Sequence, residues 1–305
     1  MEYKGRVVKS TGKWYKVDAG EEIYDCRLPG RFRLDIKEVT NPLAVGDYVT
    51  FQVEDDGTGV IHEILPRKNY IPRQATFGRR GEQILAANVD RAWVVQAARD
   101  PKFNPGFIDR FLVTCEAYEL HGGIIINKID LMDEGDRNYL HAMAAEYYEL
   151  GYPVHFTSAT RQENLEKLIE ELRDKTSVFI GPSGVGKTAL LNAIEPEANF
   201  KTGEISRFSN KGKHTTTFAQ LVPLQIGGFI VDTPGLREFG LVNIKKSELS
   251  LYFPEMIEPR QYCRFNNCTH FHEPGCGIAE AYEVGDISAS RYNSYLNILE
   301  SLPDG

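Results

Sequence analysis

The first 68 residues combine short apolar segments with frequent turn signals. β-Branched and aromatic residues form five such segments, and dipeptides such as Thr11-Gly12 and Asp56-Gly57 separate them. The predicted strands are Arg6–Lys9, Trp14–Val17, Ile23–Leu28, Asp47–Val53 and Val60–Leu65. Five strands in so short a stretch favour a small β-barrel. Periodicity does not fix how strands pair, and between an OB-like and an SH3-like barrel we favour the OB-like one.

A polar segment between Pro66 and Gly81 interrupts this pattern. It contains two prolines, two glycines and five basic residues, which predicts a linker with a positive face. From Arg91 onward apolar strands alternate with segments of helical period, and this alternation predicts a parallel sheet covered on both faces. The predicted strands are 92–97, 123–126, 154–157, 177–180, 220–224 and 228–231, and the predicted helices are 106–120, 136–150, 163–173 and 187–194.

Composition and charge narrow the class of protein. Hydrophobic residues make up 42% of the 305 residues and charged ones 26%, which is typical of a soluble globular protein. The net charge of −8 argues against a chain that coats nucleic acid, so any RNA binding must use local patches. No apolar run approaches the roughly 18 to 20 residues of a membrane helix, and Met1 to Ser10 lacks the apolar core of a secretory signal. We therefore expect a cytoplasmic protein without a membrane segment.

The strongest motif follows the apolar segment 178–180 and precedes a predicted helix. It fits the pattern G-x-x-x-x-G-K-[ST] of a phosphate-binding P-loop, and a chance glycine-rich turn would not share this context. The loop consists of Gly181, Pro182, Ser183, Gly184, Val185, Gly186, Lys187 and Thr188. Its glycines let backbone N–H groups surround a β-phosphate. Lys187 supplies a charge to the phosphate oxygens, and Thr188 supplies a hydroxyl to Mg²⁺.

A second motif selects the base. Asn127, Lys128 and Asp130 form an N-K-x-D sequence at the end of a very apolar predicted strand, where ligands of open α/β sheets bind. The Asp130 carboxylate can accept both N1–H and N2–H₂ of guanine, whereas adenine lacks this pair of donors. Ser158 and Ala159 follow the next strand and add a backbone contact to the guanine O6. Taken alone, both motifs also fit ordinary helix N-caps.

Asp232 and Gly235 follow the last predicted strand. At this place the Asp232 carboxylate can lie on the Mg²⁺ side of a nucleotide, and the Gly235 amide can bind its γ-phosphate. A long polar loop over 198–217 precedes them, and loops of this length are more often functional or disordered than decorative. Thr215 or Thr216 in this loop can coordinate the Mg²⁺ of a bound nucleotide. His214 is either a group that approaches the γ-phosphate or a solvated loop residue.

The order of these motifs differs from that of ordinary small GTPases, in which the P-loop comes first. Here the guanine motifs precede the P-loop, and the switch loop and the Asp232 motif follow it. A sheet whose termini lie close together can be cut at a new place without changing its pocket. With its barrel and its Cys/His tail, the whole chain resembles the circularly permuted, small-ribosomal-subunit-dependent GTPases. The residue before the switch histidine is usually Arg in that family, and here it is Lys213, which keeps the charge but loses bidentate geometry.

The resemblance implies a GTP hydrolase that uses GTP or GDP with Mg²⁺ and acts in late maturation of the small ribosomal subunit. It implies binding to the subunit and its rRNA in the GTP state and stimulation by the subunit, and we expect a monomer. Leu236 stands where a water-positioning glutamine would be expected, so intrinsic hydrolysis should be slow. We predict that Lys187 neutralises the transferring phosphoryl group. We also predict that the subunit orders the switch loop and brings in His214.

The tail contains three of the five cysteines, between residues 263 and 276. In a reducing compartment this spacing indicates a metal rather than a disulfide. Three thiolates and one imidazole suit a closed tetrahedral zinc site, which is structural because no position stays open, and the family resemblance supports it. The predicted ligands are Cys263, Cys268, His270 and Cys276, with His272 as a competitor, whereas Cys26 and Cys115 are predicted to be plain buried cysteines.

The predicted organisation is therefore an OB-like RNA-binding barrel over 1–68, a circularly permuted GTPase domain over 69–242 and a mostly helical zinc-binding domain over 243–305. Two other functions fit parts of the pattern. An RNA-binding module could use GTP only as a locking ligand, in which case hydrolysis would not respond to the subunit. An ATP-dependent kinase would require Asp130 to be irrelevant to base selection.

Overall fold

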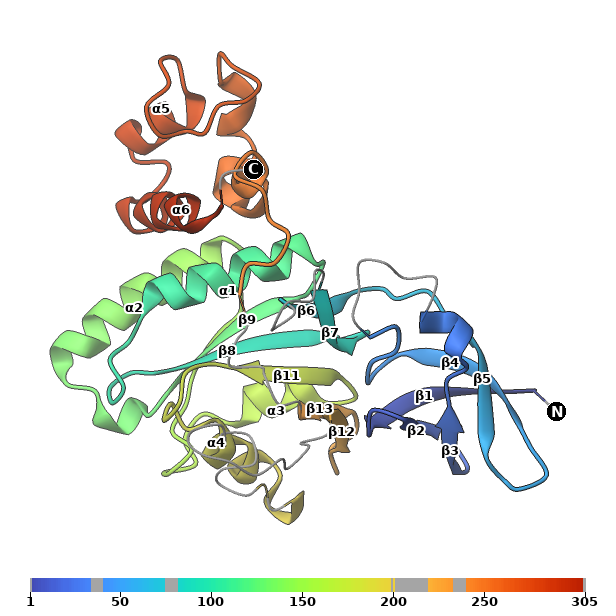
Figure 1. Cartoon of the computed structure of the whole chain (residues 1–305). Helices are drawn as coiled ribbons and strands as arrows, with labels where there is room; N and C mark the ends of the chain where they lie inside the picture. The colour runs from blue at the N-terminus through green and yellow to red at the C-terminus, as the bar shows by residue number, and fades with distance from the viewer. Residues whose placement is uncertain are drawn as a thin grey trace, which may run out of the picture.

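The structure is a computed structural model that describes residues 2–33, 41–74, 82–198, 200, 219–232 and 240–303. It shows a β-barrel next to a central sheet flanked by helices, with a helical tail beside α1 (Figure 1). The candidates His214, Thr215, Thr216 and Gly235 lie outside the described residues. Among the described residues, no helix has the length and apolar character needed to cross a membrane.

The N-terminal barrel has its strands where the sequence predicts them. They are β1 (Glu2–Ser10), β2 (Trp14–Asp18), β3 (Ile23–Arg27), β4 (Tyr48–Val53) and β5 (Gly59–Ile64), with a short 3₁₀ helix η1 (Gly30–Arg33). The strands follow the order β1-β2-β3-β5-β4, and pairing of β1 with β4 closes the barrel. Alternate residues such as Val49 and Phe51 are fully buried inside it. The five-stranded OB-like barrel is thus confirmed.

The segment predicted as a linker contains a strand instead, and that prediction is wrong. β6 (Tyr70–Gln74) pairs antiparallel with β7 (Glu82–Ala87), which the sequence did not indicate. The ladder is irregular between Ile71 and Pro72, because proline has no N–H to donate to it. Arg67 does not contribute to a positive face either, since its Nε donates to the buried Asp47 Oδ1 at 2.6 Å and ties the segment to the barrel.

The central sheet confirms the predicted α/β arrangement. Its parallel strands are β8 (Arg91–Ala97), β9 (Gly122–Asn127), β10 (Val154–Phe156), β11 (Thr176–Ile180) and β13 (Phe229–Asp232), and β12 (Ala219–Pro223) runs antiparallel to β13. The helices are α1 (Pro105–Ala117), α2 (Glu134–Glu149), α3 (Glu166–Leu172) and α4 (Lys187–Ile194), with short 3₁₀ helices η2 (Ile129–Leu131) and η3 (Pro196–Ala198). Residues of α1 and α2 share one apolar cluster with the sheet, and residues of α3 and α4 share another. The sheet is therefore covered on both faces (Figure 1).

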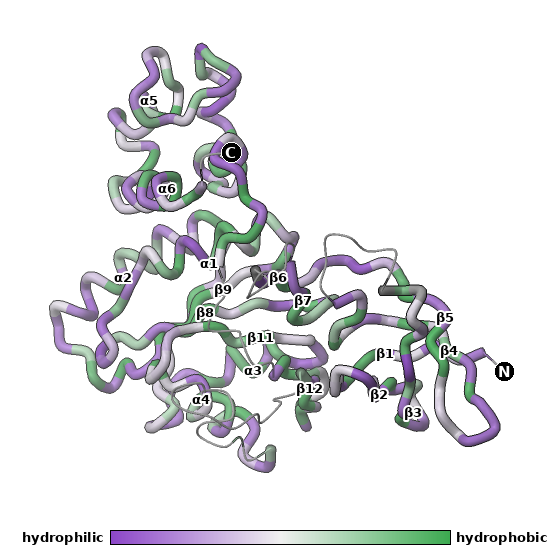
Figure 2. Tube along the Cα trace, viewed as in Figure 1, coloured by the Kyte–Doolittle hydropathy of each residue, from purple (hydrophilic) through white to green (hydrophobic). Residues whose placement is uncertain are grey.

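Local sequence explains how the covering helices begin. The Asn104 side chain accepts from the Phe107 N–H at the start of α1, and Pro105 occupies the first turn, where no N–H is needed. At α2, Asp133 and Asp136 form a reciprocal capping box. The tube of α2 alternates between polar and apolar colours in Figure 2, and its buried residues lie at helical spacing from Leu140 to Tyr147.

The barrel and the central sheet are joined by strand pairing. Lys9 of β1 lies opposite Gln220 of β12, and Ser10 lies opposite Ala219. This pairing makes one 11-stranded sheet from the barrel to β10. The amphipathic pattern of β1 does not reveal it, because edge pairing uses backbone groups rather than side chains.

The tail packs on α1 around its own core. Its elements are η5 (Leu249–Tyr252), η6 (Pro254–Met256), η7 (Pro259–Tyr262), α5 (Gly277–Val284) and α6 (Ala289–Ser301). Apolar tail residues such as Phe253 and Tyr295 cluster with Val113 of α1. At the same boundary Arg291 of α6 pairs with Asp109 of α1, and both side chains are buried. The helical tail thus has a fixed contact with the central domain.

Candidate nucleotide site and metal cluster

The predicted nucleotide motifs meet at one edge of the central sheet. The P-loop follows β11, Asn127 ends β9, Ser158 lies just beyond β10, and Asp232 ends β13. These strands run parallel, so their carboxyl ends lie along the same edge. Ligands of open α/β sheets bind at this edge.

Two positions of the P-loop admit only glycine. A Cβ added at Gly181 would lie 2.2 Å from the Val95 carbonyl oxygen, and one added at Gly186 would lie 2.4 Å from the Asn127 Nδ2. Gly186 also has a φ of 93°, which side chains rarely adopt. The loop can therefore pack directly on β8 and β9 only because these positions lack side chains.

Lys187 and Thr188 begin α4 directly after this loop. Lys187 is 6% exposed, and its Nζ donates to the carbonyl oxygens of Gly181 at 2.7 Å and Pro182 at 2.8 Å. The ammonium group is thus held against the loop at the positive end of the helix dipole. This arrangement concentrates positive charge where an anionic phosphate would bind.

Asn127 links the P-loop to the loop after β10. Its side chain is 1% exposed, and its Nδ2 donates to the Val185 carbonyl oxygen at 3.0 Å. Its Oδ1 accepts from the Thr157 hydroxyl at 3.3 Å and from the Ala159 N–H at 3.1 Å. One buried amide therefore fixes the P-loop and the loop after β10 against the end of β9, a role that the linear motif does not reveal.

Asp130 takes its partner from the loop after β10. The Ser158 hydroxyl donates to Asp130 Oδ1 at 2.5 Å, and the Lys128 Nζ donates to the Asp100 carbonyl oxygen. The alternative that Asp130 caps the following helix is wrong, because Asp133 caps α2. Ser158 does not cap α3 either, whose N-cap residue is Leu165.

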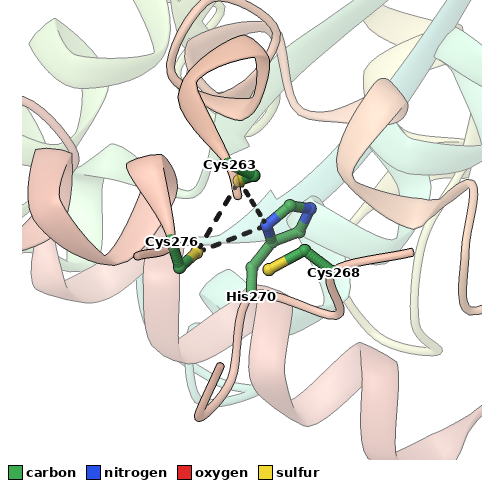
Figure 3. Close-up of side chains that lie close together, drawn as sticks. All are labelled: Cys263, Cys268, His270 and Cys276. Atoms are coloured by element: carbon green, nitrogen blue, oxygen red, sulfur yellow. Dashed lines mark hydrogen bonds between the residues drawn. The ribbon is translucent and has the colours of Figure 1, made fainter. Parts of the chain in front are cut away.

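The four predicted zinc ligands lie together in the tail (Figure 3). The ligand atoms of Cys263, Cys268, His270 and Cys276 all lie within 4.8 Å of one another. Cys263 Sγ and Cys276 Sγ are 3.9 Å apart, and each lies 3.4 Å from His270 Nδ1. Tetrahedral zinc with ordinary bond lengths places sulfur ligands about 3.8 Å apart and sulfur and nitrogen about 3.5 Å apart. The cluster therefore has the dimensions of a zinc site.

The protonation chemistry of the cluster also suits a cation. Burial lowers the pKa of His270 to about 4, which keeps the imidazole neutral, as a metal ligand must be. Burial and the neighbouring thiols Cys276 and Cys263 raise the pKa of Cys268 to about 12. A thiolate at Cys268 therefore needs a positive ion beside it at neutral pH.

Ser250 is a supporting residue that sequence reasoning missed. It is buried in η5, and its hydroxyl lies 3.1 Å from His270 Nε2, the nitrogen that faces away from the cluster. Such a partner fixes the orientation of a ligating imidazole. The competing ligand His272 is exposed and outside the cluster. Cys26 and Cys115 are buried, as predicted.

Comparisons with known proteins agree with this geometry. A family model described as RsgA GTPase matches residues 64–242, and one described as RsgA N-terminal domain matches residues 4–61. The chain belongs to the RsgA family of GTPases. It is 44% identical to the small ribosomal subunit biogenesis GTPase RsgA of Phocaeicola vulgatus, covering 99% of this chain and 98% of that one.

Two solved structures share the RsgA fold along the whole chain. The crystal structure of YjeQ from Thermotoga maritima is 35% identical with a TM-score of 0.80, over 98% of each chain. YloQ, described as a circularly permuted GTPase, is 31% identical with a TM-score of 0.75, over 100% of this chain and 98% of that one. The predicted permuted motif order is thus confirmed. As a member of this family, the chain is a GTP-hydrolysing enzyme, which rejects the alternative of an ATP-dependent kinase.

Proposed function

We propose that this GTPase acts in late maturation of the small ribosomal subunit. In this proposal it works in the cytoplasm as a monomer, binds the subunit and its rRNA in the GTP state, and is stimulated by the subunit. The observation that carries the proposal is the full-length similarity to a small ribosomal subunit biogenesis GTPase, in a chain whose nucleotide motifs meet at one sheet edge. The barrel lies at one end of the central sheet and the tail lies beside α1 (Figure 1), and in this proposal both contact RNA.

The roles that we propose for the site residues follow the sequence motifs. The nucleotide contacts are assigned to Asn127, Lys128, Asp130, Ser158, Ala159, Gly181–Thr188, Thr215, Thr216, Asp232 and Gly235. Lys187 and His214 are assigned to catalysis. The Thr188 hydroxyl and the Asp232 carboxylate are oxygen ligands of the kind that Mg²⁺ prefers. Bound Mg²⁺ would neutralise charge on the phosphates.

The proposal includes one structural zinc ion held by the Cys₃His cluster. It also assigns three domains, 1–68, 69–242 and 243–305, to RNA binding, GTP hydrolysis and zinc binding. The dimensions of the cluster and its neutral imidazole support the metal assignment. Four protein ligands close the site, so the zinc would hold the tail together rather than activate water.

The guanine assignment predicts a change of base preference. Asp130→Asn should weaken GTP binding and favour xanthosine triphosphate, because an amide can donate to the xanthine C2 oxygen. Loss of a charged hydrogen-bonded pair costs about 1.5 to 3 kcal/mol, or at least roughly tenfold in affinity. Titration with both nucleotides measures it, and Asp133→Asn, which keeps a good N-cap three residues away, is the matched control. An unchanged GTP affinity would refute the assignment.

The role of the subunit predicts a single-turnover result. Hydrolysis should be slow without small subunits and should accelerate when they are added. A hydrolysis rate that does not respond to the subunit would instead support an RNA-binding module that uses GTP only as a locking ligand.

His214→Ala should lower the stimulated hydrolysis rate by about 10²-fold or more, as expected for loss of a positioned polar group, with little change in GTP affinity. Subunit affinity is measured on the same preparation. Parallel loss of affinity and stimulation indicates docking, and undiminished stimulation removes His214 from the mechanism.

A further inference from the structure

Asp232 is held by a side chain from the neighbouring strand. Gln220 of β12 lies directly opposite Asp232 of β13 in the antiparallel register, and its Nε2 donates to Asp232 Oδ2 at 3.2 Å. Directly opposed residues of an antiparallel pair carry their side chains on the same face of the sheet. The contact therefore follows from the register of the hairpin.

This face of the hairpin is the one that α4 covers. Side chains alternate along a strand, so Asp232 shares its face with Ile230. Ile230 is buried in the same apolar cluster as Leu190 of α4. The side chains of Gln220 and Asp232 thus point to the side of the sheet on which the P-loop leads into α4.

The backbone of Gln220 is fixed along both edges of β12. On one side it pairs with β13, and on the other it lies opposite Lys9 of the barrel strand β1. A strand with a partner on each side has little freedom to shift its register. The pairing of β12 with both β13 and the barrel strand β1 therefore holds the Gln220 amide in a fixed position next to Asp232.

We propose that Gln220 is a positioning residue for the magnesium side of the nucleotide site. Its neutral amide orients the Asp232 carboxylate without cancelling the negative charge that attracts a cation. A lysine or arginine donor at this place would hold the carboxylate equally well but would compete with the metal for its charge. This inference rests on the proposed role of Asp232 toward Mg²⁺.

The test compares nucleotide binding with and without the metal. The affinity of Gln220→Leu for a non-hydrolysable GTP analogue is measured across a series of Mg²⁺ concentrations and in EDTA. Loss of the hydrogen-bond partner of a metal ligand typically lowers metal affinity by about 10- to 100-fold. The Mg²⁺ concentration that gives half-maximal binding of the GTP analogue should therefore rise about tenfold or more. Affinity in EDTA should stay within about twofold of wild type, since the removed amide bonds to Asp232 and not to the nucleotide.

Gln225→Leu is the matched control on the same hairpin. Its side-chain amide also donates to a carboxylate, that of Glu197, but it lies in the turn at the opposite end from Asp232. This control should leave the Mg²⁺ dependence unchanged. Gln220→Thr, which keeps strand propensity but lacks the reach, replaces Gln220→Leu if the leucine variant does not fold.

Asp232→Asn separates failure of this inference from failure of the proposed function. If Asp232→Asn and Gln220→Leu both weaken the Mg²⁺ response while binding in EDTA persists, Gln220 is confirmed as a positioning residue. If only Asp232→Asn does so, the inference about Gln220 is overturned and the assignment of Asp232 stands. If Asp232→Asn leaves the Mg²⁺ response unchanged, both are overturned. If Gln220→Leu lowers the affinity for the GTP analogue equally with Mg²⁺ and in EDTA, Gln220 has a merely structural role and the proposal is also rejected.

Discussion

Cys268→Ser is expected to release the zinc and unfold the tail while GTP binding persists. Cys268 lies in a cluster whose four ligand atoms are within 4.8 Å of one another, and the same cluster joins the loops around η7 and α5. Structural zinc commonly contributes about 10 kcal/mol or more to the folding of a small module. The nucleotide motifs lie at the carboxyl edge of the central sheet and use none of these ligands.

Metal analysis and limited proteolysis measure this result. The wild-type protein should carry one zinc ion per chain, and the variant should lose it and become cleavable beyond about residue 242. Cys115→Ala is the matched control, because Cys115 is buried in α1 and belongs to no metal cluster among the described residues. Wild-type protein purified without zinc would refute the assignment, and so would a variant that keeps the metal.

Arg291→Met is expected to destabilise the contact between the tail and the GTPase domain by about 3 to 5 kcal/mol, as when one partner of a buried ion pair is removed. Arg291 is 1% exposed. Its Nε donates to Glu255 Oε1 at 2.7 Å and its Nη1 donates to Asp109. Its guanidinium lies 4.6 Å from the centre of the Phe253 ring. Methionine fills much of the space but leaves two carboxylates buried without a cation.

The charge balance explains why the loss should be large. Burial disfavours the charged form of Arg291, but Asp109 and Glu255 outweigh burial and raise the pKa of the guanidinium above its usual value. Tyr147 of α2 also donates to Asp109 Oδ1, at 2.7 Å, so the group joins α1, α2 and α6. Arginine is thus the only cation of this group, and nothing within it replaces the lost charge.

Urea unfolding of the zinc-loaded protein measures the free energy change. Lys245→Met is the control, because the Lys245–Glu248 pair is exposed and such pairs contribute about 0.2 to 1 kcal/mol. Adding Asp109→Asn to Arg291→Met should restore part of the lost free energy of unfolding, because it removes one uncompensated charge. The prediction is contradicted if Arg291→Met lowers the free energy of unfolding no more than Lys245→Met does.

The sequence predicted the nucleotide motifs because phosphate and guanine binding depend on short contiguous segments. Gly181 and Gly186 allow the loop to approach its neighbours, and Asp130 lies in η2, three residues after the end of β9. The barrel strands were also predictable, since alternate residues such as Val49 and Phe51 are buried. The tail ligands were recognisable because thiol and imidazole groups occur there at close spacing.

The tertiary structure decided how these parts are joined. The β6–β7 hairpin, the pairing of β1 with β12 and the bond from Arg291 to Asp109, 182 residues away, have no signal in any local pattern. The same holds for Gln220, which would pass for an ordinary polar strand residue until its register with Asp232 is known. Hydropathy and spacing describe relations between residues that are close together in the sequence. The partners of strand edges and of buried charges come from distant segments, so only the tertiary structure determines these pairings.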